Sequence, residues 1–350
     1  MSARNEITPD ILQRLARMRA DGERVLSVYF NLDPERFATP PARASQLRSL
    51  LDEARRRIES GGRPHDELEQ LRADLDRVAE HLRRDRFAEG AHAHAVFCCS
   101  PLELFETLSL PQPVEAFVTI DSTPFIAPLA EIGPAGRWCI ALVNRRVTRV
   151  LRGSASNLSE VLSFGDNVHG QHSQGGWSQA RYQRSVSHDV EEHLRRTSEA
   201  LLSQFRHRPF GGLLIAAPEE LRSAVVDALH PYTRERLAGF IEVDVETASP
   251  DQVRAGAERV IAERDEELVH AQLERLRAGL GNGGRAAAGP EQVSRCLEER
   301  RVETLLFTAG ARDPALEQAV HAALDQGADV LPVDSPDLGP LGGIAALLRF

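Results

Sequence analysis

The first third of the chain alternates between strand-like and helix-like spacing of its hydrophobic positions. The run RVLSVYFNLD (Arg24–Asp33) is rich in β-branched and aromatic residues and ends in turn formers, so it predicts a strand. Residues 42–85 carry leucine and alanine at helical spacing and are interrupted at SGGRP (Ser60–Pro64), which predicts a helical hairpin. Three more strand-like runs follow, AHAVFCCS, LFETLSL and VEAFVTI. We therefore expect an α/β domain over residues 1–130.

The middle of the chain restarts this pattern. The run from Arg137 to Ser154 predicts two strands joined by a tight turn at Asn144–Arg145. A long helix is expected from about Ser178 to Arg206, followed by a buried strand at Gly211–Pro218, a helix, and a further strand at Phe240–Glu246. Alternating strands and helices of this kind predict an α/β domain with a mainly parallel sheet, over residues 131–250.

A long charged helix leads into the last third. It is expected over Ser249–Leu280, with Ser249 as the N-cap and Pro250 at the first helical position. Beyond it the chain reads as helix (PEQVSRCLEERRV), strand (ETLLFTA), helix (DPALEQAVHAALDQG) and strand (ADVLPVD). A third α/β domain is therefore expected over residues 251–350.

Composition and charge restrict the function. The 350 residues carry a net charge of −10, which argues against a general nucleic-acid binder but leaves room for a locally basic surface. Every basic side chain other than histidine is arginine, a planar group suited to binding phosphate. No apolar run is long enough to span a membrane, and the first residues lack the apolar stretch of a signal peptide. We expect a cytoplasmic protein that binds neither membrane nor DNA.

The four cysteines do not form a disulfide framework. Cys98 and Cys99 end the strand-like run that also carries His92 and His94, two residues apart on one face. No further cysteine or histidine lies at ligand spacing, so we favour core residues over a metal site and expect no metal and no cofactor.

One polar, glycine-rich segment precedes the long middle helix. Gly175 and Gly176 allow backbone conformations and close approaches that other residues do not. On the helix, Trp177, Arg181, Arg184, His188 and Arg195 recur at spacings of three, four and seven, and thus share one side. Arginines there would bind phosphate and the tryptophan would stack on a base, although a solvated helix face gives the same pattern. The segment GQHSQGG matches neither the dinucleotide fingerprint nor the P-loop.

Several segments in order resemble the archaeal and eukaryotic class-I translation release factors, a superfamily that includes Pelota. HSQGGWSQARYQR resembles the Gly-Gly-Gln loop and the arginine-bearing helix behind it. RWCIALVNRRVTRVLRGSASNLSEVLSFGD and GGLLIAAPEELRSAVV resemble the family's segments before and after that loop, and LGGIAALLRF resembles its C-terminal signature. The resemblance implies a three-domain architecture with a ribonuclease-H-like middle domain and a kink-turn-binding-protein-like C-terminal domain.

The resemblance also implies a site. The loop would enter the peptidyl-transferase centre of the ribosome, where a backbone N–H helps to hold the developing oxyanion and water attacks the peptidyl ester. The implied catalytic residues are Gly175, Gly176 and Gln179. The implied rRNA- and tRNA-binding residues are His172, Gln174, Trp177, Ser178, Arg181, Arg184 and His188.

The chain departs from the family at two places. Trp177 follows the two glycines where the family has glutamine, and Gln179 is the nearest glutamine after them. The first domain carries neither of the family's codon-reading motifs, Asn-Ile-Lys-Ser and Tyr-x-Cys-x-x-x-Phe, which makes stop-codon decoding unexpected.

Two functions remain open at this point. The chain is expected either to hydrolyse peptidyl-tRNA in ribosome rescue or to occupy the A site without hydrolysis, as a Balon-like hibernation factor. The resemblance implies the ribosome as partner, with an elongation-factor-type GTPase or the ribosomal stalk bound by the third domain. An α/β protein that no longer visits the ribosome is the third reading, because fold alone does not fix function.

Overall fold

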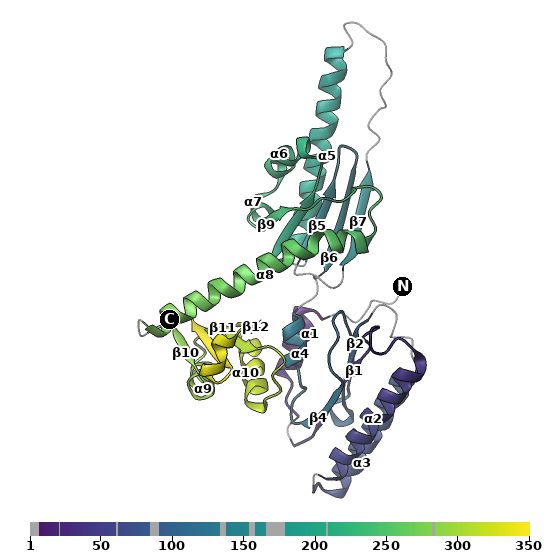
Figure 1. The fold of residues 1–350 in the computed structure, drawn as a ribbon, viewed down its shortest axis with the longest axis vertical. Helices are drawn as coiled ribbons and strands as arrows, with labels where there is room; N and C mark the ends of the chain where they lie inside the picture. The colour runs from purple at the N-terminus through teal and green to yellow at the C-terminus, as the bar shows by residue number, and fades with distance from the viewer. Residues whose placement is uncertain are drawn as a thin grey trace. The chain divides into compact units, whose positions relative to one another are not determined.

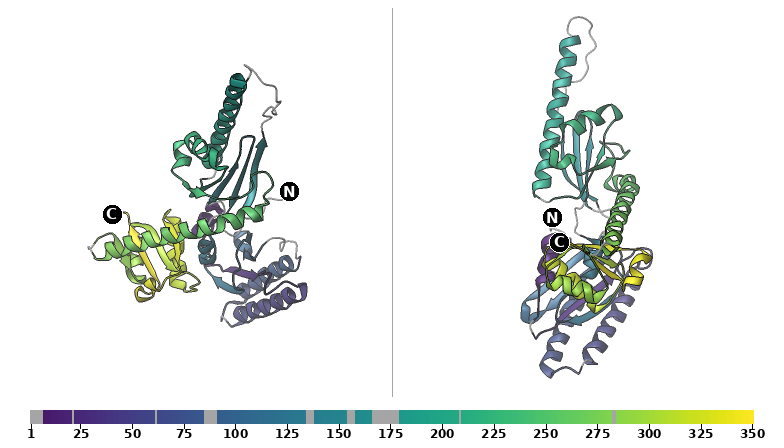
Figure 2. Two further views of the ribbon diagram at one scale, coloured as in Figure 1. Left: turned by 45° about the horizontal axis from the view of Figure 1, so that its top comes forward. Right: turned by 90° about the vertical axis from the view of Figure 1, so that its left-hand side faces the viewer.

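The structure is a computed structural model that describes residues 7–20, 22–60, 62–84, 91–133, 138–153, 158–165, 179–207, 209–281 and 284–350, with the backbone alone between 179 and 187. Contacts divide the chain into two compact units. One unit joins residues 1–134 to residues 269–350, and the other comprises residues 135–268. Figure 1 shows the elements along the chain, and Figure 2 gives two further views.

The first sheet is antiparallel, in the order β3-β2-β1-β4. Its strands are β1 (Val25–Asn31), β2 (Ala93–Cys99), β3 (Leu104–Leu110) and β4 (Phe117–Asp121). Successive side chains point to opposite faces of a strand, and both faces of β1 are covered. Leu26, Val28 and Phe30 pack on one side, whereas Val25 and Tyr29 join a second core. Burial on both faces explains why this strand reads as a continuous apolar run.

The predicted helical hairpin is confirmed. Helix α2 (Pro40–Glu59) begins at Thr39, whose hydroxyl accepts a hydrogen bond from the amide of Ala42. Helix α3 (His65–Arg83) returns along it, and the two helices contribute one apolar stripe each to the core over β1. The stripe residues are Leu47, Leu50, Leu51, Ala54, Ile58, Leu71, Leu75, Val78, Ala79 and Leu82.

The C-terminal sheet has the order β10-β13-β11-β12 and combines parallel and antiparallel pairs. Its elements are β10 (Ala286–Ala288), α9 (Pro290–Glu298), β11 (Val302–Thr308), α10 (Pro314–Asp325), β12 (Asp329–Val333), η2 (Pro336–Leu341) and β13 (Ile344–Leu348). Helix α10 packs against α1 (Pro9–Arg17) and α4 (Ala127–Ile132), and a 3₁₀ turn, η1 (Ser100–Leu102), joins β2 to β3. One hydrophobic cluster therefore contains residues from both ends of the chain.

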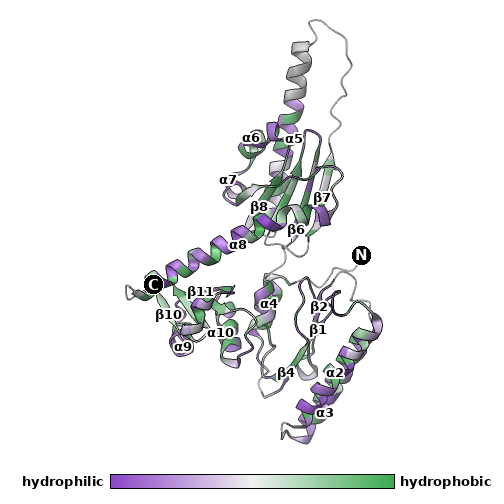
Figure 3. Cartoon of the chain, in the orientation of Figure 1, coloured by the Kyte–Doolittle hydropathy of each residue, from purple (hydrophilic) through white to green (hydrophobic). Residues whose placement is uncertain are grey.

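The middle unit is built on a five-stranded sheet, β7-β6-β5-β8-β9. The strands are β5 (Trp138–Val143), β6 (Val147–Gly153), β7 (Leu158–Gly165), β8 (Gly212–Ala216) and β9 (Leu237–Phe240). One face is covered by α5 (Gln179–His207), α6 (Glu219–Ala228) and α7 (Pro231–Arg234), and the other by the first half of α8 (Pro250–Gly281). In Figure 3 the inner strand β8 is hydrophobic, whereas the hydropathy changes repeatedly along α8.

Two expectations for the middle unit are wrong. The sheet is mixed, because β5 pairs parallel with β8 and antiparallel with β6. The strand expected at Phe240–Glu246 lies earlier, at Leu237–Phe240. Beyond it Asp244 accepts hydrogen bonds from the amides of Glu246 and Thr247, which closes a turn. Alternating acids gave Phe240–Glu246 the period of a strand, but the turn-forming Asp244 ends the strand geometry.

Other expectations are confirmed. The β5–β6 hairpin turns at Asn144, whose side-chain oxygen accepts from the amides of Arg146 and Val147. Ser249 caps α8, since its hydroxyl accepts from the amide of Gln252 while the Gln252 side chain accepts from the amide of Ser249. The α/β fold class is confirmed, and one sheet falls in each predicted domain range. The domain limits remain predictions.

Within the described residues, no helix is long and apolar enough to cross a membrane. The four cysteines are free and buried.

A histidine pair joins the helical hairpin to the first sheet. His81 on α3 stacks on His94 of β2, with ring centroids 5.3 Å apart and the two Nε2 atoms 3.1 Å apart. Burial, and then the nearby His81, lower the pKa of His94 from 6.5 to about 3. Burial and Arg84 lower the pKa of His81. The pair is therefore neutral in the folded protein.

We predict that this pair makes the protein acid-sensitive. Protonation favours the unfolded chain, so stability is lost as the pH falls below 6.5, and for His94 the loss continues towards about 3. The slope should reach roughly 1.4 kcal/mol per pH unit for one proton. Urea unfolding at a series of pH values checks this. His94→Phe should flatten the acid limb, and the exposed control His65→Phe should not; equal slopes in all three proteins would contradict the prediction.

Candidate functional site

The glycine-rich segment lies between two elements of the middle unit, β7 and α5. Residues 166–178 are outside the described residues, and with them six predicted site residues, namely His172, Gln174, Gly175, Gly176, Trp177 and Ser178. Gln179 is the first residue of α5, and Arg181 and Arg184 follow in its first two turns. His188 is the first residue of α5 whose side chain is described, and it is exposed.

Helix α5 is longer than the strand it follows. Its 29 residues span about 43 Å, against about 27 Å for the 8 residues of β7. Its buried positions begin at His193 and continue through Leu194, Thr197, Ser198 and Leu201. The first turns of α5 extend past the end of the sheet, on the side where β7 ends (Figure 1). The fold thus places the predicted site residues of α5 at one extremity of the middle unit.

The helix separates the arginines from its packing face. With about 100° between successive residues, Arg181, Arg184 and His188 fall within about 60° of one another. Leu194 and Leu201, which pack on the sheet, lie about 80–160° around the helix from these three positions. The position of Gln179 falls with the packing face rather than with the arginines. Positions 181, 184 and 188, predicted to bind phosphate, therefore lie on a different side of the helix from position 179, which is predicted to be catalytic.

Arg195, the last member of the predicted stripe, is already paired. Its guanidinium binds the carboxylates of Glu192, at 2.5 Å and 3.0 Å, and of Glu199. These acids one turn away on either side offset its charge. The basic surface predicted from the sequence therefore does not include Arg195.

A buried polar network seats α5 on the sheet. The Thr148 hydroxyl on β6 lies 3.0 Å from Nε2 of His193 and 2.7 Å from the Thr197 hydroxyl. Thr197 also donates to the carbonyl of His193, at 2.9 Å. All three residues are buried, with at most 1% of their surface exposed, so these hydrogen bonds satisfy polar atoms that water cannot reach.

Phe164 connects this network to the other root of the loop. It is the residue before Gly165, the last of β7, and it pairs with Thr148. Its ring lies 5.7 Å from the His193 ring and 4.9 Å from the Arg196 guanidinium. The end of β7 and the start of the packed part of α5 are therefore held to each other.

At its far end α5 is fixed by a buried arginine. Arg152, with 6% of its surface exposed, donates to the Gln204 carbonyl at 3.1 Å and lies 5.4 Å from the Phe210 ring. The sequence analysis named none of Thr148, His193, Phe164 or Arg152. Polar side chains at buried positions of an amphipathic helix were the available signal for His193.

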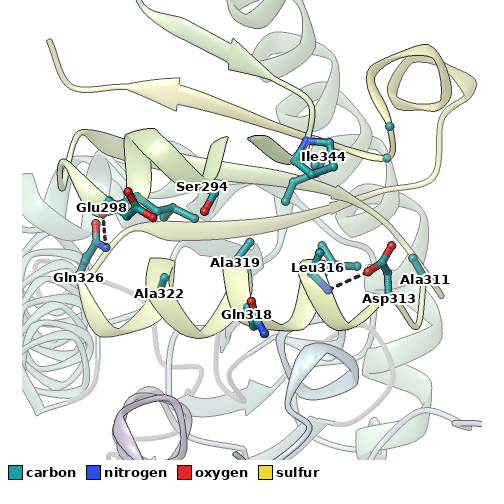
Figure 4. A pocket seen from close by; sticks show the side chains of 15 residues that line it. Ser294, Glu298, Ala311, Asp313, Leu316, Gln318, Ala319, Ala322, Gln326 and Ile344 are labelled. Atoms are coloured by element: carbon teal, nitrogen blue, oxygen red, sulfur yellow. Dashed lines mark hydrogen bonds between the residues drawn. The ribbon is translucent and has the colours of Figure 1, made fainter. Parts of the chain in front are cut away.

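A second concave surface lies in the C-terminal sheet layer, between α9 and α10 (Figure 4). The pocket has a volume of about 350 Å³, and apolar residues such as Leu316, Ala319 and Ile344 line much of it. At one end Gln326 donates to the Leu297 carbonyl at 2.7 Å, and its buried Oε1 has no hydrogen-bond partner among the described residues. Glu298 lies at the same end (Figure 4). The polar side chains of Glu298 and Gln326 at that end offer hydrogen-bond acceptors.

Comparison with known proteins finds similarity to release factors. Residues 124–262 match the family described as bacterial archaeo-eukaryotic release factor family 10. The matched range contains β5 to β9, α5 and the glycine-rich segment. The resemblance inferred from the sequence is confirmed.

Curated relatives are archaeal. The chain is 26% identical to peptide chain release factor subunit 1 of Aeropyrum pernix over 266 residues, 69% of each chain. It is 25% identical to the Archaeoglobus fulgidus factor of the same name over 315 residues, 86% of this chain and 75% of the relative. With the Methanopyrus kandleri factor it shares 24% identity over 212 residues, 58% of this chain and only 51% of the relative.

Two solved structures that match the chain have low identity and low TM-scores. An archaeal translation termination factor, aRF1, matches with a TM-score of 0.30 and 19% identity, over 98% of this chain and 99% of the factor. Ribosome-bound archaeal Pelota, in a structure that also contains ABCE1, matches with a TM-score of 0.48 and 17% identity, over 74% and 77% of the two chains.

We predict that the Thr148–His193 contact stabilises the middle unit. Thr148→Val keeps the shape of the side chain but leaves His193 buried without this partner, which should cost about 1–3 kcal/mol. Urea unfolding followed by the fluorescence of Trp138, buried in the same unit, measures the loss. Ser163→Val, on an exposed position of β7, is the matched control and should change stability by no more than about 0.5 kcal/mol. Equal effects of the two substitutions would contradict a structural role for the network.

Proposed function

We propose, from the match of residues 124–262 to the bacterial archaeo-eukaryotic release factor family 10, that this chain acts on the ribosome in the cytoplasm as a peptidyl-tRNA hydrolase of ribosome rescue. The loop with Gly175 and Gly176 would enter the peptidyl-transferase centre. The observation that carries the proposal is the family match over residues 124–262, which covers this loop and the elements that hold both of its roots.

The geometry of α5 supports this assignment. An extended helix end, fixed on the sheet by Thr148, His193 and Arg152, can carry a loop away from the body of the protein without losing its direction. Arg181 and Arg184 stand at helix positions outside the packing face, where rRNA phosphates could approach. The glycines allow backbone to pass close to RNA, and a backbone N–H there would stabilise the oxyanion formed when water attacks the ester.

The proposal assigns one role to each predicted residue group. Gly175, Gly176 and Gln179 would form the hydrolytic tip. His172, Gln174, Trp177, Ser178, Arg181, Arg184 and His188 would contact rRNA and tRNA. No metal and no cofactor enters the reaction, since water and a preorganised site suffice for ester hydrolysis.

Peptide release from stalled ribosome–nascent-chain complexes tests the proposal. Wild-type protein should free tRNA from peptide, and Gln179→Ala should slow the release about 100-fold, the loss expected when reacting groups are misplaced by roughly 1 Å. The matched control Gln183→Ala, one turn further along α5, should release peptide at the wild-type rate. Ribosome pelleting should be equal for all three. Absence of release by wild type, where a known hydrolase is active, would rule out hydrolysis.

A second candidate is a hibernation factor that occupies the A site without hydrolysis. The observation that favours it is Trp177, which stands where the family has its glutamine. The two functions share the ribosome contacts and differ only in chemistry, so binding and release must be measured separately.

Charge reversal on α5 should weaken ribosome binding under both functions. We predict that Arg181→Glu together with Arg184→Glu loses at least about tenfold in affinity for vacant ribosomes at moderate salt, because two phosphate contacts become repulsive. Sedimentation at increasing salt measures this. Arg254→Glu with Arg259→Glu on α8 makes the same change in net charge elsewhere in the middle unit and should have little effect. An equal loss from both pairs would indicate a general charge effect instead of a specific contact.

The pocket between α9 and α10 is our proposed contact for an elongation-factor-type GTPase or the ribosomal stalk. It is lined by Gly342, Gly343 and Ile344, which belong to the C-terminal segment that resembles the family signature. Its apolar wall would take an aliphatic side chain, while Glu298 and the Oε1 of Gln326 would accept from a donor beside it.

We predict that Ala315→Arg, at the mouth of this pocket, lowers affinity for the cognate GTPase or stalk protein at least about tenfold by filling the space a side chain of the partner would occupy. Pull-down and titration calorimetry with each purified candidate would measure it. Ala255→Arg, on an exposed position of α8, is the same substitution away from the pocket and should bind as wild type. If both variants bind equally well, the contact lies elsewhere.

A further inference from the structure

The first and last domains meet at a buried ionisable pair on α10. Glu317 and His321 are one helical turn apart, and only 6% and 2% of their surfaces are exposed. Nε2 of His321 lies 3.2 Å from Oε1 of Glu317. Burying two ionisable groups together costs free energy unless each group makes its full set of hydrogen bonds. The donors and acceptors around each group therefore indicate whether it is charged.

Both ring nitrogens of His321 face atoms that can only accept. Nδ1 lies 2.9 Å from the carbonyl oxygen of Ala16, at the end of α1. Nε2 lies 2.7 Å from the carbonyl oxygen of Pro124, between β4 and α4. A neutral imidazole carries one N–H and would leave a lone pair facing one of these oxygens, whereas the imidazolium donates to both. The geometry therefore requires a protonated ring.

The Glu317 carboxylate is used in the same way, as an acceptor only. It accepts from the amide of Ile126, and from the amide of Ala127 at 3.0 Å, where α4 begins. The pair thus reaches from α10 in the C-terminal domain to three places in the N-terminal domain, the end of α1, the chain at Pro124 and the start of α4. The apolar residues around it belong to the one cluster that spans both domains.

We propose that Glu317 and His321 form a charged clasp between the first and third domains, which loosens when His321 loses its proton. The apolar contacts hold the two domains together, and the clasp fixes their register through its hydrogen bonds. In the neutral state the ring can satisfy only one of its two carbonyl partners, and Glu317 is left as an uncompensated buried anion.

Other charged groups face the clasp from several elements. Arg57 of α2, Asp121 of β4 and Arg312 before α10 line the same cavity as Glu317. Arg19, after α1, donates to the same Ala16 carbonyl as His321, and Arg17 of α1 pairs with Asp325 of α10 at the surface. Tyr29 of β1 donates its hydroxyl to the Phe125 carbonyl. Burial, and then the charges of Glu317 and of Glu131 on α4, raise the pKa of Tyr29.

The direction of the pH effect follows from these contacts. Burial lowers the pKa of His321, but the hydrogen bond and charge of Glu317 and the two carbonyls outweigh it and raise the pKa above 6.5. A group with a raised folded pKa contributes its stability fully below the unfolded value and loses it as the pH rises through the folded value. The clasp should therefore weaken as the pH rises, whereas the His81–His94 pair lowers the stability of the protein as the pH falls.

Nuclear magnetic resonance of full-length protein with labelled histidine tests the charge state directly. The His321 ring, assigned by its absence in His321→Gln, should show two slowly exchanging N–H protons at neutral pH and a titration midpoint above 6.5. A neutral ring at neutral pH, or a midpoint at or below 6.5, would overturn the proposal. Should His321→Gln not fold, Glu317→Gln provides the assignment through the shift of the same signals.

Amide exchange tests whether the clasp holds the interface. The amides of Ile126 and Ala127, which donate to Glu317, should lose protection at least about tenfold as the pH passes the His321 midpoint, after correction for intrinsic rates. The amide of Val96, inside the first sheet, should keep its protection. His207→Gln, an exposed histidine at the end of α5, should leave the profile unchanged. Constant protection of Ile126 and Ala127 across the midpoint would show that the pair does not govern this contact.

Discussion

The unit formed by residues 1–134 and 269–350 depends on a hydrophobic core shared between segments that are far apart in the chain. Residues before 131 and residues after 286 contribute to the same cluster, in which Leu15 and Phe97 pack with Val320 and Phe307. The entropy cost of closing a loop rises only slowly with the length of the loop. A large buried apolar contact can therefore offset this cost even for segments so far apart in the chain. The middle unit is consequently an insertion between two parts that fold against each other.

This constraint separates two tasks within one chain. The shared core and its charged clasp stabilise the unit from residues 1–134 and 269–350, while the middle unit carries the glycine-rich segment on its own sheet. Within the middle unit, α5 is fixed by Thr148, His193 and Arg152 over its packed part only. The backbone of the first turns of α5 continues beyond the end of the sheet (Figure 1).

The two histidine sites show how environment decides the behaviour of one residue type. His94 faces another histidine in a buried stack, and its pKa falls to about 3. His321 faces a carboxylate and two carbonyls, and its pKa rises. His94 lies between helices and sheet, and His321 lies between domains. Protonation weakens the first contact and strengthens the second.

The sequence by itself determined the elements whose signals are local. The helical hairpin broken at Ser60–Pro64, the turn at Asn144 and the N-cap at Ser249 follow from spacing and from hydrogen bonds between near neighbours. The family relationship also came from the sequence, because motifs kept their order along the chain. The parallel pairing of β5 with β8 and the contact of His321 with Ala16 were decided only by the tertiary structure. Such strand partners and buried hydrogen bonds join residues that are far apart in the chain, and periodicity within a segment carries no information about them.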